Sequence, residues 1–171
     1  MSIQKAMLDL VPEFTAIRQH LHQYPELSHK EFQTSEFIAS CLNSWGIEAH
    51  TDIAGTGVVG VLKNGEGTKS IALRADMDAL AISEKNPFSH CSKNQGVMHA
   101  CGHDGHMAML LMAARYLAQT RQFSGTVYFV FQPSEEQDGG ASEMVQAEKE
   151  DLAQSILFDT FTPDMSPELM K

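Results

Sequence analysis

Thr126-Val-Tyr-Phe-Val-Phe131 is an uninterrupted apolar segment, and it is the strongest indication of the fold class. A short run rich in β-branched and aromatic residues is typical of a strand that is covered on both faces of a sheet. The run leads directly into Gln132-Pro133-Ser134-Glu135-Glu136, so a polar segment follows the carboxyl end of this strand. Gly139-Gly140 then opens a stretch of about ten residues that we expect to be helical.

Upstream of this strand, the hydrophobic periodicity alternates between helical and extended patterns. Helices are predicted at residues 3–21, 31–45 and 107–120. Strands are predicted at residues 47–51, 58–62 and 70–75, and a polar loop at 84–96. Pro12 either kinks the first helix or begins a second one. Because strands alternate with helices, the sequence predicts an α/β fold with a three-layer sheet.

The composition excludes several classes of function. Acidic residues outnumber basic ones by 22 to 12 in a chain of 171 residues, which gives a formal charge of −10. Such a charge disfavours binding to nucleic acid or to an anionic membrane surface. No apolar run approaches the ~20 residues that a membrane span needs, and Asp9 interrupts any signal-peptide core. The three cysteines (Cys41, Cys91 and Cys101) suggest no disulfide scaffold, so we expect a cytoplasmic protein.

The segment His99-Ala-Cys-Gly-His-Asp-Gly-His106 concentrates potential metal ligands before a predicted helix. Thiolate and imidazole are ligands that borderline cations such as Zn²⁺ prefer. We expect an extended loop in which Cys101 and His103 point the same way and Gly102 allows close approach of the backbone. The alternative is a solvated polar loop in which Asp104 only caps the helix.

Two further acidic clusters follow predicted strands: Asp76 with Asp78, and Glu135 with Glu136. Ligands of open α/β sheets bind beyond the carboxyl ends of the strands, so these clusters and the histidine segment are expected to converge. Adjacent carboxylates point in different directions, so one glutamate can bind a cation while the other acts as a general base. A solvated glutamate pair is the alternative.

Three other roles remain open from the residues alone. An aspartate at the end of the 70–75 strand either orients an imidazole ligand or caps a turn. Arg74 either binds a substrate carboxylate or pairs internally. Cys101 could be a nucleophile paired with histidine, but no nucleophile-elbow pattern surrounds it.

Five segments together carry a resemblance to a known family, in the expected order over about residues 10–147. They are Arg18–Leu27, Gly55–Val61, Ile71–Leu80, Met98–His106 and Phe131–Glu136. The sequence resembles the metal-dependent amidohydrolases of the aminoacylase and carboxypeptidase G2-like group, especially hippurate hydrolases, N-acyl-amino-acid amidohydrolases and auxin-conjugate hydrolases. The resemblance implies a three-layer αβα, zinc-exopeptidase-like fold, of which the chain would contain only the N-terminal part of the catalytic domain.

The resemblance also implies the chemistry. Cys101, His103 and Glu136 would bind metal, Glu135 would be the general base, and Asp78 would support the metal centre. Two divalent cations are implied (Zn, Mn, Co or Ni). The implied reaction is hydrolysis of the amide bond of a small N-acyl amino acid by metal-activated water, after which Glu135 protonates the leaving amine.

The sequence departs from the family pattern in its second half. The family's further histidine ligands lie beyond the glutamates, whereas this chain has no histidine after His106, and Ala81 stands where the family has proline. We therefore expect residues 1–148 to be the N-terminal portion of the catalytic domain and 149–171 to be an atypical tail. We expect the dimerisation domain, and with it the family-type homodimer, to be absent. Such a truncated chain would bind metal weakly and have little or no activity, and a non-catalytic metal-binding or interaction module is the alternative function.

Overall fold

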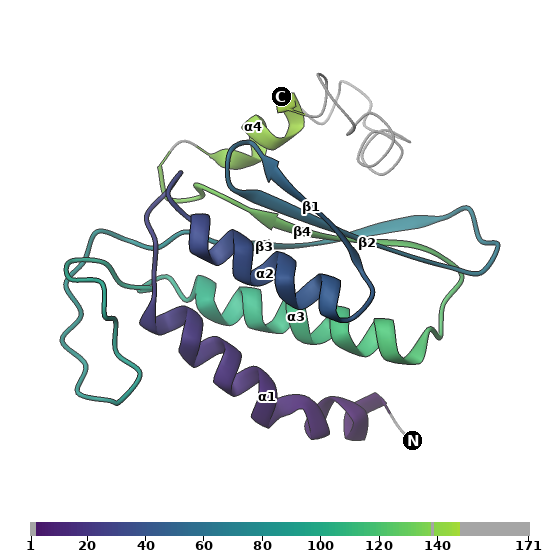
Figure 1. Cartoon of the computed structure of the whole chain (residues 1–171), viewed down its shortest axis with the longest axis horizontal. Helices are drawn as coiled ribbons and strands as arrows, with labels where there is room; N and C mark the ends of the chain where they lie inside the picture. Colours follow the sequence, from purple (N-terminus) through teal and green to yellow (C-terminus); the bar gives the residue numbers. More distant parts are fainter. Residues whose placement is uncertain (1–2, 138, 148–171) are drawn as a thin grey trace, which may run out of the picture.

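The computed structural model describes residues 3–137 and 139–147, in which four strands form one mixed sheet (Figure 1). The strands are β1 (Glu48–Ile53), β2 (Gly57–Asn64), β3 (Ser70–Asp76) and β4 (Gly125–Gln132). Their order in the sheet is β1-β2-β4-β3. Strand β2 is antiparallel to both β1 and β4, whereas β3 and β4 are parallel. Polar segments that follow β3 and β4 therefore leave the sheet at the same edge.

Helices cover both faces of the sheet, which confirms the predicted three layers. Figure 1 shows α1 (Ile3–Gln23), α2 (Phe32–Ser44) and α3 (His103–Thr120) on one face. Among the described residues, one helix lies on the opposite face, α4 (Gly140–Ala147). Within residues 3–137 and 139–147, the helical layer formed by α4 is therefore smaller than the layer formed by α1, α2 and α3.

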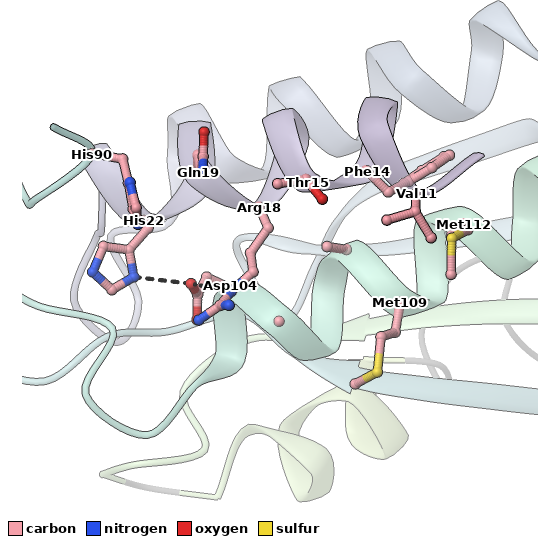
Figure 2. A pocket seen from close by; sticks show the side chains of 12 residues that line it. Val11, Phe14, Thr15, Arg18, Gln19, His22, His90, Asp104, Met109 and Met112 are labelled. Atoms are coloured by element: carbon pink, nitrogen blue, oxygen red, sulfur yellow. Dashed lines mark hydrogen bonds and ion pairs between the residues drawn. The ribbon is translucent and has the colours of Figure 1, made fainter. Parts of the chain in front are cut away.

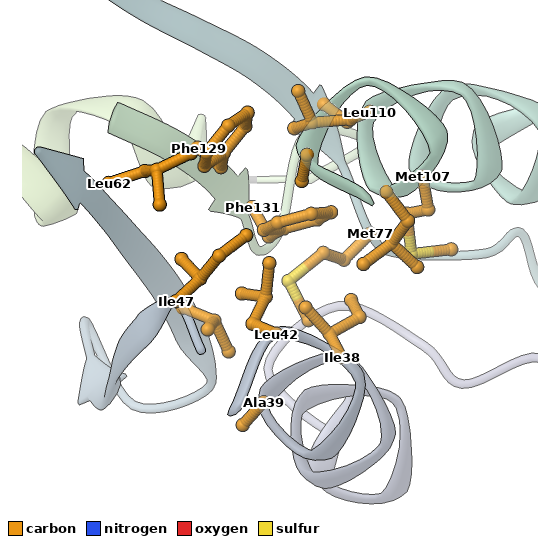
Figure 3. Close-up of a cluster of buried hydrophobic side chains, with 14 of the residues drawn as sticks. Ile38, Ala39, Leu42, Ile47, Leu62, Met77, Met107, Leu110, Phe129 and Phe131 are labelled. Carbon is orange, nitrogen blue, oxygen red and sulfur yellow. The ribbon is translucent and has the colours of Figure 1, made fainter. Parts of the chain in front are cut away.

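The principal hydrophobic core lies between the sheet and the three helices (Figure 3). Strand β4 sends Val127, Phe129 and Phe131 into this core. Its alternate residues Tyr128 and Val130 face the other side, where they pack in a smaller cluster with Met144 of α4. Both faces of β4 are therefore covered, as its continuous apolar pattern predicts. Seven other large side chains of the principal core are under 2% exposed: Ile38, Leu42, Ile47, Leu62, Met77, Met107 and Leu111.

Pro12 lies inside a continuous α1, so it does not begin a second helix, which was one of the two alternatives for it. Helix α3 begins at His103 rather than at 107, because the residue before it, Gly102, has a φ of +84° that turns the chain directly into the helix. The segment around Cys101 is consequently a turn and not the extended loop that we expected. None of the helices within the described ranges is long and apolar enough to cross a membrane.

Candidate metal centre

The parallel pairing of β3 with β4 places the predicted ligands beyond the carboxyl ends of these two strands. Asp76, the last residue of β3, is the register partner of Gln132, the last residue of β4. The polar segments that follow both strands meet the N-terminus of α3 there. Side-chain donor atoms of Cys101, His103 and Glu136 all lie within 4.8 Å of one another. The structure thus brings together the three residues that are predicted from the sequence to be metal ligands.

The turn at Gly102 explains how Cys101 and His103 meet without an extended loop. A positive φ is accessible to glycine at little cost, and it reverses the chain between the thiol and the imidazole. His103 is then the first residue of α3, and its side chain is 2% exposed. The side chains of Cys101 and His103 therefore lie close together, as expected. A tight turn brings them together, and not the extended loop that we expected.

Asp78 holds the His103 ring in one orientation. The Nδ1 atom of His103 lies 2.8 Å from the main-chain oxygen of Asp78 and 3.2 Å from its carboxylate Oδ1. A ring that donates through Nδ1 keeps the lone pair of Nε2 available for a cation. The hydrogen bond with Asp78, opposed by burial, raises the pKa of His103. Asp78 therefore orients the imidazole, which is the first of the two roles left open for an aspartate at this strand end.

The Asp78 carboxylate also anchors two other segments. Its Oδ2 accepts hydrogen bonds from the Ser28 hydroxyl at 2.7 Å and from the main-chain N–H of Glu136 at 3.0 Å. Burial alone would raise the pKa of Asp78, but the hydrogen bonds from His103, Glu136 and Ser28 outweigh it and hold this pKa well below its usual range. Asp78 is thus an ionised link between β3, α3 and the glutamate loop.

The Glu136 carboxylate and the Cys101 thiol have the properties of a cation site. Oε1 of Glu136 is buried without a hydrogen-bond partner and lies 3.6 Å from Nε2 of His103. A hydrogen bond to Glu136, together with burial and nearby carboxylates, raises the pKa of Cys101. This is the opposite of the lowered pKa that activates a cysteine nucleophile, and it disfavours that alternative. A mixed sulfur, nitrogen and oxygen donor set with a buried unpaired carboxylate oxygen fits a divalent cation.

Glu135 points away from its neighbour, as expected for adjacent carboxylates. Its Oε2 accepts hydrogen bonds from the Arg74 guanidinium at 2.6 Å and from the Gln132 amide at 2.7 Å. Arg74 also donates to the Gln132 side-chain oxygen at 2.6 Å. Arg74 therefore pairs internally in this structure, which was one of the two roles left open for it. Glu135 is held beside the ligand triad without being part of it.

Glu31 is a structural residue of the site that the sequence analysis missed. Its side chain is fully buried at the start of α2, where it accepts hydrogen bonds from the Thr56 hydroxyl at 2.7 Å and the Ser134 N–H at 2.9 Å. Ser134 has a φ of +53° and directly precedes the glutamate pair. Glu31 therefore fixes the loop that carries the candidate base and ligand. Its position at a predicted helix start, beside no other polar motif, gave no signal of this role.

A separate hollow of about 460 Å³ lies between α1 and α3 (Figure 2). It does not contain the ligand triad. At one end, His22 is buried between Asp104 at 2.9 Å and Glu84 at 3.1 Å, and Arg18 contacts Asp104 at 3.1 Å. This network ties α1 and the 84–96 loop to the first turn of α3. Asp104 is thus an ion-pair partner of α1 and not the helix cap, because Gly102 is the N-cap of α3 and no side chain of the described residues caps this helix.

Comparisons with known proteins show the family of this chain. The model of peptidase family M20/M25/M40 matches residues 72–167, which is more than half of the chain. This chain belongs to peptidase family M20/M25/M40. Its family relatives include the hippurate hydrolase of Campylobacter jejuni, which is 47% identical over 146 residues, and the N-acyl-L-amino acid amidohydrolase of Geobacillus stearothermophilus, which is 45% identical over 147 residues.

Solved structures of the family share the fold. A putative aminohydrolase from methicillin-resistant Staphylococcus aureus superposes with a TM-score of 0.83 at 35% identity, covering 91% of this chain and 40% of that one. The YXEP protein of Bacillus subtilis, described as a dinuclear metal-binding peptidase, superposes with a TM-score of 0.76 at 40% identity, covering 80% of this chain and 39% of that one. These matches confirm the αβα fold that the sequence motifs imply.

The matched region is a minority of each relative. It comprises 85% of this chain in both enzymes, but only 38% of the Campylobacter protein and 40% of the Geobacillus protein. Residues 149–171, which we predicted to be an atypical tail, lie outside the described residues.

Proposed function

We propose that this chain provides the first part of the active site of a metal-dependent amidohydrolase that cleaves N-acyl amino acids. One observation carries the proposal: a thiol, an imidazole and a carboxylate from two chain segments converge, with Glu135 held next to them. Relatives named as hippurate hydrolase and N-acyl-L-amino acid amidohydrolase support the substrate class. Residues 1–148 would then be the N-terminal portion of the catalytic domain. Three cysteines that form no disulfide support a reducing, cytoplasmic location.

The residues of the site divide into cation ligands, a residue that orients a ligand, and a base in the proposed reaction. Cys101, His103 and Glu136 would hold a divalent cation such as Zn, Mn, Co or Ni, and Asp78 would orient His103. When bound, such a cation polarises a carbonyl and makes a water molecule more acidic. Glu135 would accept a proton from the attacking water and return it to the nitrogen of the departing amino acid.

The contacts of Glu135 suit a base that takes up and releases a proton. Arg74 and Gln132 both donate to Oε2, so these two contacts from described residues leave the other carboxylate oxygen available for the proton. Arg74 would limit rotation of the carboxylate between the two transfers. The side chains of Arg74 and Glu135 are 45% and 43% exposed, so both are accessible to a substrate.

The whole reaction is best tested in a chimera, because the chain spans about two fifths of its enzymatic relatives. Residues 3–147 would replace the matching part of the Campylobacter hippurate hydrolase. We expect the chimera to hydrolyse N-benzoylglycine or a related N-acyl amino acid. Glu135→Ala should abolish turnover while sparing metal binding, whereas Glu36→Ala, on the exposed side of α2, should leave both unchanged. A folded, metal-loaded chimera with no amidohydrolase activity on a panel of N-acyl amino acids would refute the proposal.

Of the ligands that the family resemblance implies, the described residues contain three, Cys101, His103 and Glu136, and the sequence has no histidine after His106. We therefore propose that the chain binds one cation weakly and turns over little or no substrate by itself. Two stoichiometric cations and ordinary hydrolysis rates, measured on the 171-residue protein, would contradict this.

A further inference from the structure

The Nε2 atom of His103 faces two carboxylates. It lies 3.6 Å from Oε1 of Glu136 and 3.6 Å from Oδ2 of Asp76. On the Glu136 side the third donor is the Cys101 thiol, as described above. On the Asp76 side the third donor is His106, whose Nδ1 lies 2.6 Å from Oδ1 of Asp76. Donor atoms of Asp76, His103 and His106 all lie within 4.8 Å of one another, as do those of the first triad.

We propose that Asp76, His103 and His106 form a second, overlapping position for a divalent cation, which does not use the Cys101 thiol. The proposal rests on His103 being a cation ligand, as in the proposed function. A carboxylate with two imidazoles is a common donor set for zinc and for manganese or iron. Donors that share a tetrahedral zinc at about 2.0–2.2 Å stand roughly 3.3 Å apart, so shifts on the order of 1 Å would complete this triad.

The two positions exclude each other. Nδ1 of His103 is engaged by Asp78, which leaves Nε2 as the only ring nitrogen for a cation. One imidazole nitrogen ligates one cation at a time, so His103 and the four donors around it hold one ion in either of two places. The expected stoichiometry is therefore one cation per chain.

The two positions differ in chemistry and in access. The thiolate position favours softer cations, whereas the position with two imidazoles and a carboxylate accepts harder ones such as Mn²⁺. Asp76 and His106 also line a hollow of about 480 Å³ along β3 and α3, which Cys101 does not line. The side chain of His106 is 46% exposed, so a cation can reach this position without passing the thiol. Arg74, whose NH1 lies 3.7 Å from Oδ2 of Asp76, carries a positive charge that would weaken the binding of a cation at this position.

Cobalt titration of the full chain separates the two positions, because only the thiolate position gives a sulfur-to-cobalt charge-transfer band. We expect wild type to bind one Co²⁺ and to show the band. Cys101→Ser should still bind one Co²⁺ without the band. His106→Ala should retain the band, and in the Cys101→Ser background it should weaken binding at least about tenfold. His20→Ala, an exposed histidine of α1, should change nothing.

Asp76→Asn serves as a second variant, because it removes the charge but preserves the shape of the buried side chain. It should weaken cobalt binding in the Cys101→Ser background as His106→Ala does. If Cys101→Ser, shown to be folded by its circular dichroism, binds no cobalt, the second position is refuted while the thiolate site of the proposed function stands. If Cys101→Ser binds cobalt and His106→Ala does not weaken that binding, the second position is likewise refuted.

Discussion

The buried carboxylate of Glu31 accepts a hydrogen bond of 2.9 Å from the main-chain N–H of Ser134, which is 103 residues later in the chain. This contact connects the first turn of α2 to the loop that carries Glu135 and Glu136. The loop follows β4 directly, and Asp78 holds its other side through the N–H of Glu136. The position of the glutamate pair therefore depends on two acidic residues, Glu31 and Asp78, which accept hydrogen bonds from main-chain N–H groups of its loop.

Replacing Glu31 by alanine should destabilise the protein and loosen the metal centre. The substitution leaves the Ser134 N–H and the Thr56 hydroxyl without their partner in a buried place, which should cost about 3 kcal/mol of unfolding free energy. Urea denaturation measures this loss, and Glu36→Ala on the exposed face of the same helix is the control. An unchanged denaturation midpoint for Glu31→Ala would contradict the role assigned to this carboxylate.

Asp78→Asn should weaken zinc binding without removing it. The main-chain oxygen of Asp78 still orients the His103 ring, but the negative charge that makes the imidazole a stronger ligand is lost. Loss of such a supporting carboxylate typically costs 10- to 100-fold in metal affinity, and we expect about that loss here. Calorimetric titration with zinc provides the measurement, with the exposed Asp9→Asn as a control. Equal affinities of wild type and Asp78→Asn would show that the carboxylate does not act on the cation.

Acid should destabilise the fold through His99. Both ring nitrogens of His99 are buried without a hydrogen-bond partner, and burial, in part offset by Asp104, lowers its pKa to about 4. In the unfolded chain the pKa is about 6.5, so between these two values only the unfolded state takes up the proton. Stability is therefore full above about pH 6.5, falls as the pH decreases towards 4, and has lost about 3 kcal/mol there.

The contribution of His99 can be isolated by comparing variants in the presence of a chelator. His99→Phe should remove this part of the pH dependence of the unfolding free energy, whereas His20→Gln, exposed on α1, should retain it. If the difference between wild type and His99→Phe does not change between pH 7 and 4, the buried neutral imidazole is not responsible.

Zinc should protect one thiol selectively. Cys101 is exposed and belongs to the ligand triad, whereas burial, assisted by Glu13, raises the pKa of Cys41 to about 11. With an aromatic disulfide reagent at neutral pH, we expect Cys101 to react faster than Cys41. One equivalent of zinc should slow the reaction of Cys101 and leave those of Cys41 and Cys91 unchanged. Mass-spectrometric quantification of each labelled cysteine gives the rates, and no zinc effect on Cys101 would argue against its coordination.

The two edges of the sheet predict where copies of the chain associate. The β1 edge carries the polar residues Glu48, His50 and Asp52, which discourage strand pairing. The β3 edge instead carries Ile71, which is 55% exposed, and the half-buried Leu73. Ile71→Lys should therefore lower the fraction of self-associated protein at high concentration, as measured by light scattering. Thr51→Lys on β1 is the matched control, and a similar effect of both variants would place association elsewhere.

Patterns in the sequence were sufficient to predict the layers of the fold, and the resemblance to the family supplied the candidate ligands. The apolar run of β4 predicts a strand covered on both faces, since only burial on both sides makes an uninterrupted apolar segment favourable. The clusters at Asp78, Cys101 and Glu136 each follow a recognisable pattern in sequence. Together with the alternation of strands and helices, these patterns predict that the clusters meet beyond the carboxyl ends of the strands. The structure confirms this convergence.

The orientation of the candidate ligands, and the contacts that hold them, depend on long-range packing that the sequence did not reveal. Gly102 can adopt a positive or a negative φ, so the sequence could not fix whether Cys101 lies in an extended loop or a turn. The hydrogen bond between Glu31 and Ser134 and the pairing of Asp76 with His106 join residues far apart in the chain. Such contacts leave no periodic signal, because they depend on how α2, α3 and β4 pack and not on local propensity. The sequence therefore determines which chemical groups are available, and packing determines their partners.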